Sequence, residues 1–202
     1  MIKALSEDLR NKISAGEVVE NPASVVKELI ENSLDANSTQ IMIVIEKGGH
    51  RIIQVSDNGI GISPEDLPSS VMRFHTSKIR ELKDLFEIET LGFRGEALAS
   101  IASVSEMTIT SNVREREGSC LKFVNGSHNG VEPAPKINGT EITIRDLFYN
   151  TPVRKKFLKT PRTELRKIVD IVRRYGLAFP DISFKLIADD REIFNLNKEK
   201  LK

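Results

Sequence analysis

Three groups of residues in this chain of 202 amino acids have types and spacings that could carry out chemistry. The first is Glu28-x-x-x-Asn32, with Asp35 three residues further on. Residues four apart on a helix lie one above the other, so the three polar groups would share one side. A carboxylate can take a proton from water, and an amide oxygen is a hard ligand suited to Mg²⁺. The alternative interpretation is an ordinary solvated helix face.

The second group, Asp57-Asn58-Gly59-Ile60-Gly61, closes a predicted strand. The Asp57 carboxylate could accept a hydrogen bond from an exocyclic amine of a planar ligand. Gly59 and Gly61 would allow the backbone to approach that ligand closely. The alternative is a simple turn, for which Asp, Asn and Gly are typical residues.

The third group is glycine-rich and precedes a predicted helix: Leu91-Gly92-Phe93-Arg94-Gly95-Glu96-Ala97-Leu98. Successive N–H groups at a helix start form a nest for phosphate oxygens. The spacing is neither that of a P-loop nor that of a dinucleotide-binding loop, so a tight turn stays open as the alternative. Thr76-Ser77-Lys78, upstream, adds two hydroxyls and a cation, and Gly139-Thr140 is a weaker signal that could be a strand-entry turn.

Several predicted helices must position these groups. The clearest begins at Pro22, capped by Asn21, and runs to about Leu34 with an apolar arc on one side. Leu165, Ile168, Val169 and Val172 follow the helical period and predict a second amphipathic helix. Shorter helices are expected at residues 6–15, after Ser63 and at 96–102.

Strands are predicted at 40–46 and 51–56, and their four-residue connection requires an antiparallel pair. Apolar residues occupy both alternating sets in 40–46, which predicts that both faces of this strand are buried. Further strands are expected at 107–111, 119–124, 141–145, 183–188 and 192–196, with loops at 76–95 and 125–139. The pattern predicts an α+β fold with helices on one face of a mixed, mostly antiparallel sheet.

Composition limits the classes of protein further. The hydrophobic fraction is 39%, the net charge is +1, and no apolar run reaches the length of a membrane span. Cys120 is the single cysteine, which excludes an internal disulfide and a multi-cysteine zinc site. The first residues lack a signal core. We therefore expect no secretion and no membrane partner, with a cytoplasmic or nucleoid location in a bacterium and a nuclear one in a eukaryote.

In their order, the groups resemble the four nucleotide-binding blocks of the GHKL ATPases. Glu28-x-x-x-Asn32 matches the first block, Asp57-x-Gly59-x-Gly61 the second, Gly92-x-x-Gly95 the third and Gly139-Thr140 the fourth. The amino-acid sequence around and between these blocks is similar to that of the MutL mismatch-repair family over nearly the whole chain. The segments that carry this likeness are 15–22, 26–36, 76–79, 92–101 and 146–154.

The resemblance implies a two-layer GHKL sandwich over residues 1–202 that binds ATP and Mg²⁺. Glu28 would be the general base that orients the attacking water, and Asn32 would ligate Mg²⁺. Asp57 would accept from the adenine amine, with Thr140 nearby, and Gly59 and Gly61 would let the backbone approach the nucleoside.

It also implies a mobile lid over residues 76–95, on which Thr76, Ser77 and Lys78 would sit. The phosphates would be cradled by backbone N–H groups of Gly92, Phe93, Arg94, Gly95, Glu96, Ala97 and Leu98. His75 is expected to be a packing or lid residue.

For the whole protein, the resemblance implies a mismatch-repair ATPase that works with a mismatch-recognition protein and downstream repair factors. MutL proteins carry a second domain with a lysine for the γ-phosphate and dimerise as homo- or heterodimers. We therefore expect a fragment that binds nucleotide, turns it over poorly and stays monomeric without ATP. A nucleotide-binding scaffold without useful hydrolysis is the alternative.

DNA contact is a separate expectation. Between Arg154 and Arg174 there are nine basic and two acidic residues, with Phe157 as the single aromatic. Such a stretch favours contact with backbone phosphates over reading of bases, and a solvated helix face is the alternative.

Overall fold

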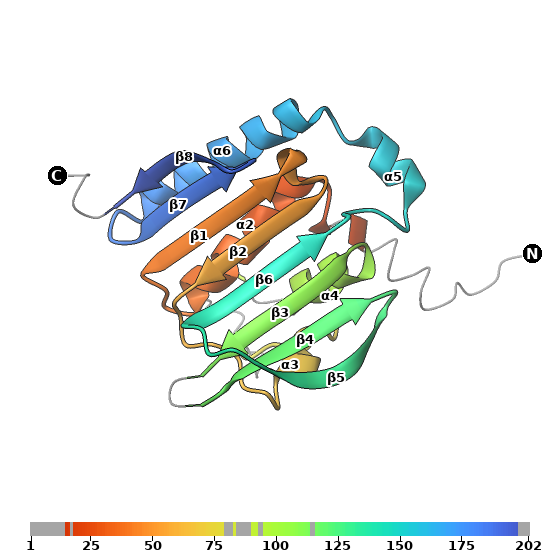
Figure 1. Cartoon of the computed structure of the whole chain (residues 1–202), viewed down its shortest axis with the longest axis vertical. Coiled ribbons are helices and arrows are strands. Elements are labelled where there is room, and N and C mark those ends of the chain that lie inside the picture. Colours follow the sequence, from red (N-terminus) through yellow and green to blue (C-terminus); the bar gives the residue numbers. More distant parts are fainter. Residues whose placement is uncertain are drawn as a thin grey trace, which may run out of the picture.

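The computed structural model describes Ala15, Gly16, Lys83 and residues 18–78, 90–92, 95–113 and 116–197. Its centre is one eight-stranded sheet with the order β5-β4-β3-β6-β2-β1-β7-β8 (Figure 1). Every neighbouring pair is antiparallel except β1 and β7, which are parallel. The strands are β1 Gln40–Glu46, β2 Ile52–Asp57, β3 Glu106–Asn112, β4 Gly118–Val124, β5 Ser127–Ala134, β6 Gly139–Arg145, β7 Ser183–Ala188 and β8 Arg191–Leu196.

The longer helices lie on one side of this sheet (Figure 1). Helix α2 packs against β1 and β2, and α6 packs against α2 and β7. The helices are α2 Pro22–Asp35, α3 Leu67–Ser70, α4 Ala97–Ser103, α5 Pro152–Phe157 and α6 Pro161–Ala178, with a 3₁₀ turn η1 at Lys47–Gly49. The mixed sheet with helices on one face is the predicted fold class.

Helix α2 begins where the sequence predicted. The Asn21 side chain accepts the N–H groups of Ala23 (3.0 Å) and Ser24 (3.2 Å), and Pro22 occupies the first helical position. The cap satisfies two N–H groups that have no partner within the helix. Val26 and Ile30 on the inner side are fully buried, so packing on the sheet holds the polar side outward.

Helix α6 confirms the second amphipathic pattern. Ile168 and Val172 are buried, and Leu165 and Val169 pack partly against the same core. The expected helix at 6–15 lies almost wholly outside the described residues. Among the described residues, no helix is both long and apolar enough to cross a bilayer.

Two fold predictions were wrong. Residues 125–139 were expected to be a loop, but Ser127–Ala134 form the edge strand β5, paired with β4. Asn125 and Gly126 both have positive φ, the conformation of a tight hairpin turn. An edge strand needs hydrogen bonds on one side only, so it tolerates Pro133 and shows little apolar alternation.

The second error concerns β1. Only Ile41, Ile43 and Ile45 are buried, whereas Met42 is 36% exposed and Val44 is intermediate. The helices cover one face of the sheet, so the opposite face of β1 meets solvent. A short apolar run does not by itself distinguish a strand buried on both faces from one buried on a single face.

Candidate functional site

Asp57, the last residue of β2, sits against helix α2. Its Oδ2 accepts the hydroxyl of Ser33 (2.8 Å), and its Oδ1 accepts the N–H of Gly59 (2.9 Å). Ser33 belongs to α2 and is buried. The carboxylate is thus held in one orientation at the end of the strand, as a group that accepts a ligand's amine must be.

Thr140 lies beside Asp57 as predicted, because β6 pairs with β2 in a register that places the two opposite each other. Both Gly139 and Thr140 belong to β6, so they are strand residues and not a turn before the strand. The Thr140 hydroxyl bonds the buried Ser111 hydroxyl (2.8 Å), which also accepts the N–H of Ile62 (2.8 Å). This network ties the loop after β2 to the neighbouring strands.

The structure gives Gly59 and Gly61 a role within the protein itself. A Cβ on Gly59 would lie 2.6 Å from the carbonyl oxygen of Ala36, and one on Gly61 would lie 2.1 Å from that of Asn112. Gly61 also has φ +77°, which disfavours any other residue. Both glycines are therefore required for close backbone packing, and their approach to a nucleoside stays a prediction.

The last turn of α2 contacts the predicted lid. Lys78 Nζ donates to Asn32 Oδ1 (3.0 Å) and to Asp35 Oδ2 (2.6 Å). The Asp35 carboxylate also accepts the N–H groups of Leu91 (2.9 Å) and Gly92 (3.1 Å). Asn32, the predicted metal ligand, therefore lies in one cluster with Lys78 of the predicted lid and with the first glycine of the glycine-rich segment.

Glu28 lies one turn earlier on α2, and its side chain is 24% exposed. Lys27 Nζ binds its Oε1 at 3.2 Å and also binds Glu31 Oε2 at 3.1 Å. Tyr175 on α6 donates to Glu31 Oε1 at 2.6 Å. The expected base is thus linked through two side chains to a neighbouring helix.

The remaining predicted residues are only partly described. Glu96 precedes α4, and Ala97 and Leu98 begin it, one residue later than expected. Gly95 has φ +62°, and its carbonyl oxygen accepts the N–H of Phe74 (3.0 Å). The predicted contacts of Phe93 and Arg94 lie outside the described residues.

The residues of the predicted lid just before Lys78 form a turn. The Thr76 hydroxyl accepts the N–H of Lys78 (3.1 Å), and Ser77 is exposed. His75 is also exposed, and its ring nitrogen bonds the carbonyl oxygen of Arg73 (2.9 Å), so it is not a buried packing residue, and its place on a lid stays a prediction.

Sequence reasoning missed Ser33 and Ser111 and gave Asp35 no role in the site. Ser33 could have been found, because it lies on the apolar arc of α2 with Val26 and Ile30 and is a polar residue in a buried position. Ser111 had no such signal. Its contact with Thr140 depends on the pairing of β3 with β6.

The donor set fits a magnesium–phosphate group. Asn32 Oδ1 already accepts a hydrogen bond from a cationic group, the Lys78 ammonium, so this oxygen can also face a metal cation. No cluster of three His, Cys, Asp or Glu residues that could hold a metal occurs in the described part of the chain. Mg²⁺ does not need one, since it takes phosphate and water oxygens with one or two protein ligands.

Together the fold and the site define a class. Three separate segments supply the candidate groups: β2 supplies Asp57, α2 supplies Glu28 and Asn32, and the loop after α3 supplies Lys78. An amine acceptor, a hard oxygen, a carboxylate and a cation are the groups that a nucleotide-binding ATPase requires. The family described as histidine kinase-, DNA gyrase B- and HSP90-like ATPases matches residues 20–146. The chain belongs to this family of ATPases.

Its relatives are more specific. The chain is 53% identical over 189 residues to the DNA mismatch repair protein MutL of Lactococcus lactis subsp. cremoris, covering 93% of this chain. It is 52% identical over 190 residues to MutL of Streptococcus pyogenes serotype M5, covering 94% of this chain. In both comparisons it spans 29% of the relative's length.

Solved structures agree with this likeness. The Aquifex aeolicus MutL ATPase domain complexed with ADP superimposes with a TM-score of 0.75 and 39% identity, covering 90% of this chain and 65% of that one. The N-terminal domain of a DNA repair protein gives a TM-score of 0.78 with 28% identity, covering 93% and 56%. The predicted resemblance to the MutL family is confirmed.

Proposed function

We propose that this chain is the Mg²⁺-dependent ATP-binding and ATP-hydrolysing part of a DNA mismatch-repair protein. In it, ATP drives a conformational change that couples mismatch recognition to downstream repair. One observation carries the proposal. Three neighbouring residues of α2 bind the end of β2 and both ends of the predicted lid: Ser33 binds Asp57, Asn32 binds Lys78, and Asp35 binds the N–H of Gly92.

In the proposed reaction, the residues position groups and form no covalent bond with the substrate. Asp57 accepts the adenine amine, and Glu28 orients the attacking water and takes its proton. Asn32 would hold Mg²⁺, which when bound supplies charge neutralisation on the phosphates. Lys78 and the N–H of Gly92 would exchange the Asp35 carboxylate for phosphate oxygens. The phosphates thereby compete with the Asp35 carboxylate for Lys78 and for the N–H of Gly92.

Titration of a fluorescent ATP analogue, with Mg²⁺ and with a chelator, tests the proposal. We expect saturable binding that weakens when the metal is removed, and stronger competition by ATP than by GTP. Turnover should then be measured in a version continued to the length of the MutL relatives. Binding without turnover there would favour the scaffold alternative, and absence of binding would refute both.

DNA is a further proposed partner. Lys155 of α5 lines a hollow of about 530 Å³ together with Lys47, Arg51 and Arg145. Lys47 follows β1, Arg51 precedes β2 and Arg145 ends β6, so the fold adds three cations to the basic stretch that the sequence indicated. Five basic or imidazole side chains, His50 included, surround one carboxylate, that of Asp146. This arrangement supports contact with backbone phosphates.

We further propose that assembly follows the MutL pattern. The protein would dimerise in response to ATP, and it would act with a mismatch-recognition protein and downstream repair factors. The likeness to MutL over 93% of the chain supports this proposal. Light scattering with ATP, ADP and no nucleotide would test it, with self-association expected for ATP alone.

A further inference from the structure

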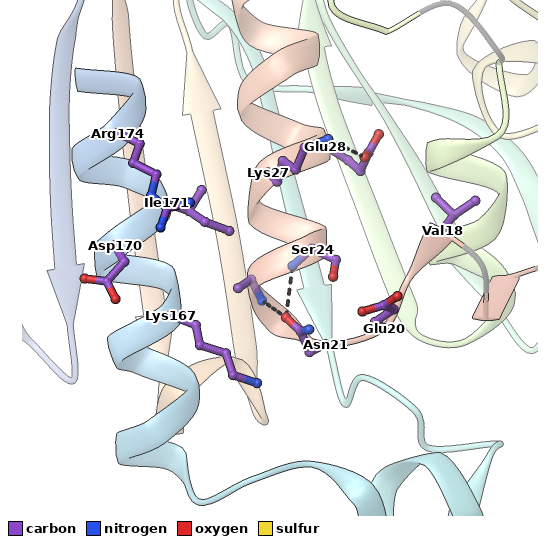
Figure 2. A pocket seen from close by; sticks show the side chains of 11 residues that line it. Val18, Glu20, Asn21, Ser24, Lys27, Glu28, Lys167, Asp170, Ile171 and Arg174 are labelled. Atoms are coloured by element: carbon purple, nitrogen blue, oxygen red, sulfur yellow. Dashed lines mark hydrogen bonds and ion pairs between the residues drawn. The ribbon is translucent and has the colours of Figure 1, made fainter. Parts of the chain in front are cut away.

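Three side chains connect the expected general base to helix α6. Tyr175 donates its hydroxyl to Glu31 Oε1 at 2.6 Å, and Lys27 donates to Glu31 Oε2 at 3.1 Å. The same ammonium of Lys27 donates to Glu28 Oε1 at 3.2 Å (Figure 2). Both oxygens of Glu31 are therefore engaged, and the series runs without a gap from α6 to Glu28.

The buried end of this series acts as an anchor. Glu31 is 9% exposed, and the Tyr175 ring stacks on Phe179 with centroids 6.2 Å apart. At the other end, the side chain of Lys27 is 45% exposed and opens on a hollow of about 480 Å³ between α2 and α6 (Figure 2). An isolated surface ion pair contributes little, because holding two long side chains costs entropy. Anchoring Lys27 through Glu31 removes part of that cost.

The protonation states of Tyr175 and Lys27 fix which groups in the series donate hydrogen bonds. Burial and then the hydrogen bond to Glu31 raise the pKa of Tyr175 well above its ordinary value, so its hydroxyl stays a donor. Burial alone would lower the pKa of Lys27, but its hydrogen bonds and charge interactions with Glu31 and Glu28 outweigh burial and raise it. Lys27 therefore stays an ammonium that donates to Glu28.

We propose that Tyr175, Glu31 and Lys27 are positioning residues that orient the Glu28 carboxylate for its work on the attacking water. Lys27 holds Oε1, so Oε2 is the oxygen left to accept the water's proton. This inference rests on the proposed role of Glu28 as the base. It extends the site to Tyr175 of α6, which is 144 residues away from Glu31 along the chain.

A purely structural tie between α2 and α6 is the competing interpretation. A structural tie would alter stability and leave the chemical step alone. A positioning series would lower kcat and leave nucleotide affinity unchanged, because the orientation of the base matters in the transition state. The two interpretations therefore differ in a measurable way.

The test is Tyr175→Phe in the version continued to the length of the MutL relatives. We expect kcat to fall about tenfold, which is less than the roughly 10²–10⁴-fold that loss of an acid–base group costs, because Glu28 itself remains. Affinity for a non-hydrolysable ATP analogue should change less than about twofold. Tyr149→Phe is the matched control, because its hydroxyl donates to Asn125 (2.9 Å), outside the series, and kcat should not change.

A double-mutant cycle provides the decisive measurement. Lys27→Met should lower kcat at least as much as Tyr175→Phe, Lys27→Arg should restore part of the loss, and the double variant should be no worse than Lys27→Met alone. Full additivity, or an unchanged kcat in a folded Tyr175→Phe protein, would overturn the inference. If Glu28→Ala itself retains turnover, the proposed function fails, and the inference fails with it.

Discussion

At the scale of single residues, Asp35 satisfies donors that the sequence had assigned to phosphate. Its carboxylate accepts Lys78 and the N–H groups of Leu91 and Gly92, and only 8% of its side chain is exposed. A bound triphosphate would have to replace this carboxylate at the same donors. Competition of this kind would make lid contacts sensitive to the ligand.

Glu28→Ala should keep ATP binding and lose hydrolysis. The base acts on water in the transition state and adds little to ground-state affinity. The expected loss in kcat is about 10²–10⁴-fold. Steady-state turnover and analogue binding, both in the version continued to the length of the relatives, measure the two quantities separately. Unchanged turnover would refute the assignment of Glu28.

Asp57→Asn should weaken adenine nucleotides selectively. The amide can still accept the N–H of Gly59, which Asp57 accepts at 2.9 Å, but it no longer offers two acceptor oxygens. We expect a loss of about 1–3 kcal/mol in ATP affinity. Parallel titrations of ATP and GTP against both proteins measure it. An equal loss for the two nucleotides would give Asp57 a purely structural role.

At the scale of elements, the contact of α2 with α6 predicts a response to alkaline pH. The pKa of Tyr175 is raised by burial and by Glu31 from an ordinary value of 10.0. Below pH 10 its contribution to stability is complete. Above it, the folded state binds more protons than the unfolded state, so the free energy of unfolding falls as pH rises. Denaturant unfolding of wild type and Tyr175→Phe between about pH 8 and 11 should show a shallower fall in the variant.

The predicted lid is the second segment for which we expect a measurable change. The sequence of residues 76–95 lacks a continuous apolar face, so little burial is expected to hold it without ligand. We expect lower hydrogen-exchange protection across 76–95 in the free protein, and higher protection with Mg²⁺ and a non-hydrolysable ATP analogue. Equal protection in both states would leave a rigid pocket without gating.

At the scale of the whole molecule, the basic hollow and the expected nucleotide site lie at opposite ends of β2. The hollow lined by Lys47, Arg145 and Lys155 lies near Ile52, the first residue of the strand, and Asp57 is the last. DNA contact and nucleotide binding would therefore use different parts of the surface. This separation allows each to be altered without the other.

Charge reversal at Arg145 or Lys155 should weaken binding to duplex DNA of any sequence. The slope of log affinity against log salt concentration is negative, and each lost phosphate contact should reduce its magnitude by about 1. Lys122→Glu is the control, since Lys122 pairs with Glu132 (3.1 Å) on β4 and β5. Fluorescence anisotropy at several salt concentrations provides the measurement. An effect equal to that of the control would remove this surface from the DNA-binding proposal.

Local chemistry in the sequence determined much of this protein. Asn21 and Pro22 set the start of α2, the turn after Glu46 required an antiparallel pair, and the spacing of Glu28 and Asn32 placed both on one side of a helix. These features depend on residues a few positions apart, so periodicity and capping are sufficient to predict them.

Contacts between distant segments were decided only by the tertiary structure. Three hydrogen bonds join α2 to other parts of the chain: Ser33 with Asp57, Asp35 with Gly92 and Glu31 with Tyr175. The edge strand β5 and the exposed face of β1 likewise depend on what the rest of the fold covers. A single sequence records side-chain chemistry and local period, but it does not record which distant surfaces are brought together when the core closes.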